Sequence, residues 1–252
     1  MLRWAPLKAG SLAGARAGPL CPRVATVGHV LRPVQSARAV PVGIDLGTSN
    51  SAVAVLAGSD PVVVLDDDGE ATVPSVVAFD EEGKALVGAV AQSRMLFDPL
   101  NTFCGIKRLI GRKFEDVGDR SKELSFKIQP GPDGFVTLDN PHRGCTLKPE
   151  EVSSHVIQKL VQQAQRHIGD QVNRAVVTVP AYFEAHQKSA TIAAAGMAGL
   201  EQVALIQEPI AAALAYGLGD PARQETILVV DMGAGTYDVS VLESFEGMLE
   251  FR

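Results

Sequence analysis

Two stretches of the chain align in register as the same strand–turn–strand unit. The first, DLGTSNSAVAVL, begins at Asp45, and the second, DMGAGTYDVSVL, begins at Asp231. Both have the alternating apolar residues of a β-hairpin around a turn that contains glycine and threonine. Their offset of 186 residues is far too long for a solenoid repeat. The repeat therefore predicts two related lobes, each of which begins with this hairpin.

Each hairpin brings glycine, a hydroxyl group and one carboxylate to its turn. Glycine lets backbone N–H groups come close to an anion, and threonine or serine hydroxyls add further donors. A single turn of this kind is an ordinary hairpin, but two that face each other would hold a polyphosphate from both sides. Asp45 and Asp231 would repel that phosphate unless a divalent cation lay between them. Mg2+ suits this place because it takes few protein carboxylates and keeps its waters and phosphate oxygens.

The two best-known phosphate loops do not occur in this sequence. There is no G-x-x-x-x-G-K-S/T motif, and no G-x-G-x-x-G motif follows a strand. The paired turns thus predict a different way of holding a nucleotide.

Strands and helices alternate in the second half of the chain. Pro149 opens a helix whose apolar residues recur every four positions and which Gly169 can close. A buried-type strand (AVVTVPAYF), a helix of small residues (SATIAAAGMAGL), a short strand (VALI) and another helix (PIAAALAYGL) follow. This alternation predicts a layered α/β fold. Residues 80–145 give mixed signals, with a helix-compatible stretch only at 90–97.

Charge is distributed unevenly along the chain. The first 40 residues hold six basic residues, four prolines and no Asp or Glu, which is typical of an organelle transit peptide; a disordered basic tail is the alternative. With only two serines in this leader, we expect the mitochondrial matrix rather than the plastid stroma. The remainder carries 17 basic and 29 acidic residues, which argues against sequence-blind nucleic-acid binding. No apolar run reaches the roughly 18 residues of a membrane span.

Five motifs together resemble the nucleotide-binding domain of the heat shock protein 70 chaperones, in an organellar form similar to the bacterial type. In order, they are VGIDLGTSNSAVAVL, IKRLIGRKF, VVTVPAYFEAHQKSAT, EPIAAALAYGL and VVDMGAGTYDVSVLE. The resemblance covers residues 42–243. It implies the actin-like ATPase fold (ribonuclease H-like), in which two lobes hold ATP or ADP with Mg2+ and K+ in the cleft between them.

The resemblance also implies a division of the chain. Residues 1–40 would be the transit peptide, and residues 41–224 would form lobe I with an inserted subdomain at about 77–150. Residues 225–252 would only begin lobe II. We therefore expect an N-terminal fragment that lacks the peptide-binding domain and is inactive by itself.

Site residues follow from the positions that match the family's motifs. Asp45 and Asp231 would organise the metal ions, and Pro180 and Lys188 would relay the nucleotide state to a substrate domain. The phosphate-binding residues would be Gly47, Thr48, Ser49, Asn50, Gly233, Ala234, Gly235 and Thr236. The catalytic residues would be Lys107, Glu208, Asp231 and Thr236.

The implied reaction is in-line attack of water on the γ-phosphate, catalysed by positioning and charge neutralisation. Lys107 would bind the γ-phosphate and position the water, and Glu208 would orient or deprotonate it. The residues by themselves also allow non-catalytic interpretations. Lys107 would then lie in a solvated basic patch, and Glu208 would be a carboxylate at the start of a helix, stabilised by the helix dipole.

Several positions depart from the family's pattern. Ala234 replaces a turn glycine, and Gln207 and Ile210 flank Glu208 where Asn and Thr are usual. Lys188 replaces an arginine, which removes bidentate hydrogen bonding. We expect hydrolysis slower than in a typical member, with nucleotide binding retained.

The leading hypothesis is an ATP-dependent chaperone that responds to stress and refolds unfolded polypeptide clients. Its partners would be those clients, a J-domain co-chaperone and a nucleotide-exchange factor. One alternative is a sugar or acetate kinase of the same superfamily. A second is a truncated, non-enzymatic protein that binds co-chaperones, and a remote one is an actin-like filament.

Overall fold

The computed structural model describes residues 40–117, 122–233 and 237–252. The leader predicted for residues 1–40 therefore lies almost entirely outside the described residues. So do three members of the second predicted phosphate turn: Ala234, Gly235 and Thr236.

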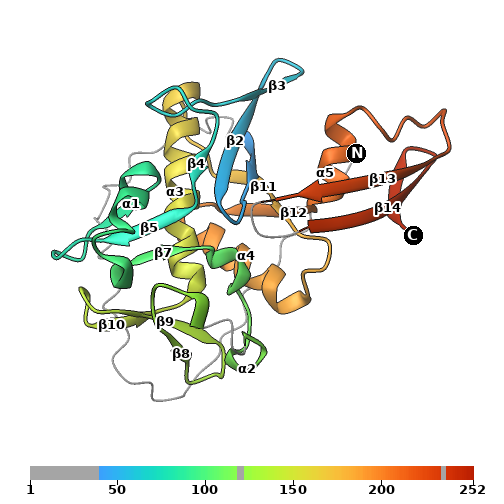
Figure 1. The fold of residues 1–252 in the computed structure, drawn as a ribbon. Helices are drawn as coiled ribbons and strands as arrows, with labels where there is room; N and C mark the ends of the chain where they lie inside the picture. The colour runs from blue at the N-terminus through green and yellow to red at the C-terminus, as the bar shows by residue number, and fades with distance from the viewer. Residues whose placement is uncertain (1–39, 118–121, 234–236) are drawn as a thin grey trace.

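A six-stranded mixed sheet forms the centre of the protein (Figure 1), with the strand order β12-β11-β1-β2-β3 and β4 paired to β2. Its strands are β1 (Pro41–Asp45), β2 (Asn50–Ala57), β3 (Asp60–Val63), β4 (Val73–Pro74), β11 (Arg174–Val179) and β12 (Gln202–Gln207). β1, β11 and β12 run parallel, whereas β1, β2 and β3 form an antiparallel meander. The first predicted hairpin is thus confirmed as β1 and β2.

The helices include the three expected in the second half of the chain. They are α1 (Ala89–Arg94), α2 (Phe114–Val117), α3 (Pro149–Ile168), α4 (Ala185–Met197) and α5 (Glu208–Ala215), with short 3-10 helices η1 (Pro99–Asn101) and η2 (Ile106–Arg108). α3 begins at Pro149 and is capped after Ile168 by Gly169, whose φ of 75° is the left-handed conformation predicted for its cap. α3 packs on both α4 and β2. These contacts confirm the mixed α/β layering.

Two small antiparallel sheets form in the stretch that gave mixed signals. The first contains β5 (Val76–Phe79), β6 (Ala85–Val87) and β7 (Thr102–Cys104), and the second contains β8 (Ile128–Pro130), β9 (Val136–Asn140) and β10 (Cys145–Leu147). Buried side chains of both sheets, among them Phe79, Phe103 and Leu138, belong to the same apolar cluster as Ile44 of β1. The segment 77–150 therefore shares one core with the central sheet.

The second predicted hairpin is confirmed as β13 (Glu225–Met232) and β14 (Tyr237–Phe245). β15 (Met248–Phe251) adds a third strand that the sequence reading did not predict. The hairpin extends away from α3 (Figure 1) and contacts the central body through α5. One of its faces remains exposed and apolar, with Leu228 64% and Met232 77% accessible.

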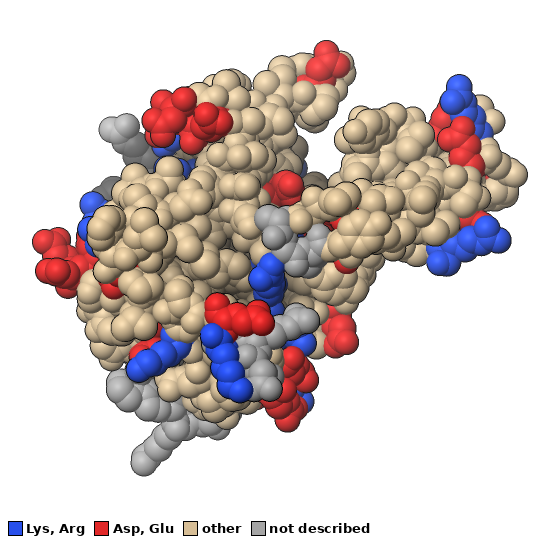
Figure 2. All heavy atoms as spheres, in the orientation of Figure 1, with Lys and Arg blue, Asp and Glu red and all other residues tan. Residues whose placement is uncertain are grey.

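The surface carries charges of both signs. On the face in Figure 2, acidic and basic side chains form small scattered groups, both at the edge and across the lower part of the face. Across the described residues, no helix is long and apolar enough to cross a membrane.

Gly111 packs against the backbone of α4 at a point where a side chain has no room. Its φ is +62°, and an added Cβ would lie 2.7 Å from Gln187 Cα and 2.8 Å from the His186 carbonyl oxygen. We expect Gly111→Ala to lower the free energy of unfolding by about 2 kcal/mol or more, from left-handed strain plus backbone overlap. Urea denaturation measures this change. Gly169→Ala is the control, because its φ is +75° but no atom lies within 4 Å of an added Cβ. An equal loss of unfolding free energy in both variants would contradict the backbone overlap at Gly111.

Candidate functional site

The turn between β1 and β2 is built around Gly47. A Cβ at this position would lie 2.0 Å from the Asn50 carbonyl oxygen. Because that neighbour is backbone, only glycine allows the chain to turn this tightly. The turn presents Thr48 and Ser49 at the end of the sheet, as the sequence predicts for a phosphate-binding loop.

A closed ring of hydrogen bonds braces this turn from one side. The Gly47 N–H donates to Ser51 Oγ at 3.2 Å, and the Ser75 hydroxyl donates to the Gly47 carbonyl at 2.9 Å. The two serine hydroxyls are 2.8 Å apart, and since the Ser75 proton is already used, Ser51 donates to Ser75. The Ser75 N–H also binds the Ser49 carbonyl at 2.7 Å. Sequence reasoning missed both serines; a hydroxyl on the buried face of a strand was the only signal.

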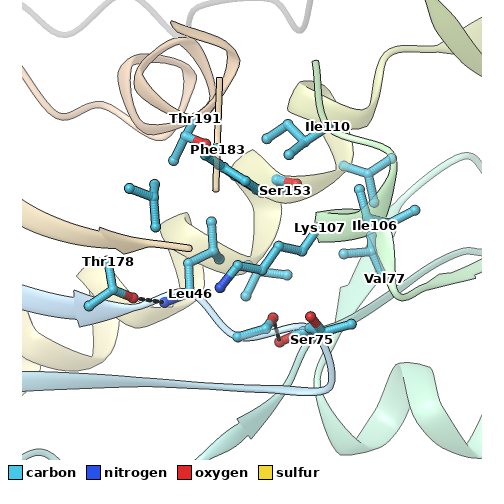
Figure 3. A pocket seen from close by; sticks show the side chains of 15 residues that line it. Leu46, Ser75, Val77, Ile106, Lys107, Ile110, Ser153, Thr178, Phe183 and Thr191 are labelled. Atoms are coloured by element: carbon cyan, nitrogen blue, oxygen red, sulfur yellow. Dashed lines mark hydrogen bonds between the residues drawn. The ribbon is translucent and has the colours of Figure 1, made fainter. Parts of the chain in front are cut away.

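Thr178 of β11 braces the turn from the other side. Its hydroxyl donates to Asp45 Oδ1 at 2.7 Å and accepts the Leu46 N–H at 3.3 Å. Figure 3 shows the bond to Leu46, and also the Lys107 side chain reaching toward the same turn. Thr178 was not among the residues expected from the sequence, since 133 residues separate it from Asp45.

Lys107 and Glu208 form an ion pair although they are 101 residues apart in the chain. Lys107 comes from η2, and Glu208 is the first residue of α5, followed directly by Pro209. Their side chains are only 10% and 18% exposed. Lys107 is therefore not part of a solvated basic patch, which the residues by themselves had left open.

The pKa of Glu208 is raised above the ordinary glutamate value. Burial is the largest cause, and the negative charges of Asp45 and Asp231 act in the same direction. The Lys107 ammonium group opposes them by its charge and its hydrogen bond. A partly desolvated carboxylate with a raised proton affinity has the properties of a general base.

A cleft of about 520 Å³ brings most of the predicted site residues together. The predicted residues that line it are Asp45, Gly47, Thr48, Ser49, Asn50, Lys107, Glu208, Asp231 and Gly233. They come from β1, the turn before β2, η2, α5 and β13. The cleft thus combines one complete glycine turn, one buried ion pair and two carboxylates from the paired hairpins.

The donors in this cleft suit a magnesium–phosphate group. Within the described ranges there is no group of three or more His, Cys, Asp or Glu residues that could hold a metal ion by itself. Mg2+ held mainly by phosphate oxygens and water needs only one or two carboxylates, and Asp45 and Asp231, which line the cleft, would be enough to supply them.

The two predicted relay residues lie in different surroundings. Pro180 lines a second hollow of about 190 Å³, which Glu208 and Asp231 also line. Lys188 lies in the first turn of α4, where its N–H binds the Glu184 carbonyl at 3.0 Å. Of the two, only Pro180 touches a hollow shared with the site residues.

The family model described as Hsp70 protein matches residues 41–252. The chain belongs to the Hsp70 family. Proteins of this family bind ATP or ADP with Mg2+, and the mixed α/β fold is consistent with the Hsp70 ATPase domain.

Curated relatives of this Hsp70 chain come from bacteria and plastids. It is 48% identical over 211 residues to the chaperone protein DnaK of Thermus thermophilus, which covers 84% of this chain and 34% of that protein. The stromal 70 kDa heat shock-related protein, chloroplastic, of Pisum sativum is 47% identical over 209 residues, which make up 83% of this chain and 30% of that protein. Heat shock 70 kDa protein 7, chloroplastic, of Arabidopsis thaliana is 45% identical over 222 residues, which make up 88% of this chain and 31% of that protein. The chain thus spans about a third of the length of these relatives.

Proposed function

We propose that this chain is the ATP-binding front part of an Hsp70 chaperone that hydrolyses ATP to drive cycles of client binding. Residues 41–224 would form lobe I of the actin-like ATPase fold, with the insertion at about 77–150, and residues 225–252 would begin lobe II. A transit peptide would precede them at residues 1–40. The observation that carries the proposal is the cleft in which the Asp45 turn, the Lys107–Glu208 pair and Asp231 meet.

In the proposed reaction, the chain binds and orients more than it reacts. The N–H and hydroxyl groups of residues 47–50 bind the β- and γ-phosphates, and the second predicted turn, whose residues 234–236 lie outside the described part of the chain, would bind the same phosphates. Lys107 binds the γ-phosphate and holds the attacking water in line with the leaving oxygen. Glu208 accepts a hydrogen bond or the proton from that water. Asp45 and Asp231 would organise Mg2+ together with K+, and the bound metal would neutralise the phosphate charge.

Partners and location follow from family membership and from the leader. We propose unfolded polypeptides as clients, together with a J-domain co-chaperone and a nucleotide-exchange factor. We also propose an organelle location, supported by the acid-free leader. The relatives named chloroplastic favour the plastid stroma over the mitochondrial matrix that the leader's composition suggested.

Phosphate release by the full-length protein tests this function. With ATP and Mg2+ it is expected to form ADP and phosphate in a single turnover, slower than a typical family member because Gln207 and Ile210 flank Glu208. Transfer of the γ-phosphate to a sugar or to acetate would support the kinase alternative instead. Absence of both reactions, with a J-domain still bound, would support the non-enzymatic one.

The raised pKa of Glu208 predicts a particular pH dependence of hydrolysis. Glu208 acts only when deprotonated, so the rate falls as the pH drops through its pKa. Since that pKa is raised mainly by burial, the fall begins at a higher pH than for an ordinary glutamate. Single-turnover rates between about pH 4 and pH 8 measure it, with Glu208→Gln as the control that lacks the acid limb. A wild-type profile that is flat over this range would exclude Glu208 as the base.

A further inference from the structure

The Thr178 hydroxyl occupies a particular place in the cleft. It makes two hydrogen bonds in opposite senses: it donates to Asp45 Oδ1 at 2.7 Å and accepts from the Leu46 N–H at 3.3 Å. The Leu46 N–H therefore fixes the oxygen, and the oxygen directs its proton at the carboxylate. No other side chain in the described parts of the chain makes a hydrogen bond to Asp45 that the structure records.

The strand that carries Thr178 is held firmly. Its neighbours Val177 and Val179 point into the core, with 0% and 1% of their surface exposed, so that Thr178 faces the cleft. The backbone of Thr178 pairs in register with Ile206 of β12, and Val177 pairs with Ile44 of β1. A β-branched side chain on such a strand has few accessible χ1 rotamers. The hydroxyl is thus a rigid reference point for the turn.

Asp45, by contrast, is exposed at the end of β1. An exposed carboxylate beside a glycine turn would sample several rotamers, and ordering it costs conformational entropy. The bond from Thr178 removes that freedom before any nucleotide binds. It occupies Oδ1, so that Oδ2 is the oxygen left for a ligand bound in the cleft.

We propose that Thr178 is a positioning residue that pre-orders the Asp45 carboxylate for the water shell of nucleotide-bound Mg2+. The inference rests on the proposed function, since it requires a magnesium–nucleotide in the cleft. Thr178 does not react and needs no contact with the phosphates. Its contribution is to the magnesium-dependent part of nucleotide affinity, because in the absence of the metal the orientation of Asp45 has nothing to act on.

The test compares nucleotide affinity with and without the metal. A fluorescent ADP derivative is titrated into the full-length protein in Mg2+ and again in EDTA, and the ratio of the two dissociation constants is the readout. The variants are Thr178→Val, which keeps the shape but removes the hydroxyl, and Thr178→Ser, which keeps the donor. Thr137→Val is the matched control: Thr137 also lies on a strand, and its hydroxyl donates to the Gln129 carbonyl at 3.0 Å in the small sheet of β8 and β9.

Thr178→Val is expected to reduce the Mg2+/EDTA affinity ratio about tenfold, as for a lost hydrogen bond to a charged group. Thr178→Ser should stay within about threefold of wild type, and Thr137→Val should leave the ratio unchanged even if it lowers the melting temperature. Wild-type-like ratios in Thr178→Val would overturn the positioning role while leaving the proposed function standing. A wild-type protein that shows no magnesium-dependent binding would overturn both.

Discussion

Gly47→Ala is expected to lower the affinity for ATP by about a hundredfold or more without unfolding the protein. The added Cβ would lie 2.0 Å from the Asn50 carbonyl oxygen, so the turn has to open. Opening it displaces the N–H and hydroxyl groups that are proposed to bind phosphate. Two lost hydrogen bonds to charged oxygens, at about 1.5 kcal/mol each, already account for a hundredfold.

The same change also breaks the brace behind the turn. The Gly47 N–H and carbonyl both belong to the ring that Ser51 and Ser75 close, so a displaced Gly47 loses these bonds as well. The loss is local, because the core residues of β1 and β2 lie outside the turn. We therefore expect a folded protein with an impaired site, rather than an unfolded one.

Gly43→Ala is the matched control for this prediction. Gly43 lies on β1 in the same hairpin, but its Cβ would meet only the Ala54 carbonyl oxygen, at an ordinary 4.0 Å. Titration of both variants with a fluorescent ATP derivative measures their affinities, and circular dichroism measures their folding. Equal affinities of Gly47→Ala and Gly43→Ala would show that the tight turn does not bind the nucleotide.

The local parts of the fold were predictable because their signals are local. The alternation around Asp45 and Asp231 specifies both hairpins, and Pro149 and Gly169 specify the ends of α3. The stretch TVPSVVAF, which contains β5, indicates an extended segment, but β15 and the strands β6 to β10 were not predicted. These strands are three to five residues long, too short for alternation to be distinguished from loop.

The site residues likewise divide into those that the sequence predicted and those that it did not. The glycine turn is visible in the sequence because glycine, threonine and serine are contiguous there. Ser75 and Thr178 were missed because their bonds to the turn span 28 and 132 residues, and nothing in the composition around them reports that closeness. Lys107 was identified only through family resemblance, since its neighbours Arg108 and Arg112 make it look like one member of a basic surface.

Lys107→Met is expected to reduce the rate of ATP hydrolysis by about 10²- to 10³-fold, the usual cost of removing one charge-stabilising donor. Lys107 is the cationic side chain that lines the cleft among the described residues, and its burial against Glu208 strengthens its interaction with phosphate. Methionine has a similar length and no charge. Nucleotide affinity should fall far less, because the turn at residues 47–50 is unchanged.

The loss of Lys107 also changes Glu208. Lys107 lowers the pKa of Glu208, against burial and the charges of Asp45 and Asp231. Without the ammonium group this pKa rises further, so the residual activity of Lys107→Met should lose its base at a higher pH than wild type does. The rate of hydrolysis and the pH at which activity falls are therefore two independent readouts of the Lys107–Glu208 ion pair.

Arg108→Met is the control, because Arg108 is the next residue in the same 3-10 helix and is exposed. It should hydrolyse ATP at nearly the wild-type rate. In single-turnover experiments, the double variant Lys107→Met/Glu208→Gln should be little slower than the slower single variant, since residues that act as a unit are not additive. Similar rates for Lys107→Met and Arg108→Met would return Lys107 to the role of an ordinary surface charge. Full additivity of the two changes would instead mean that Lys107 and Glu208 act on separate steps, and that their ion pair in the free cleft has no part in placing the water.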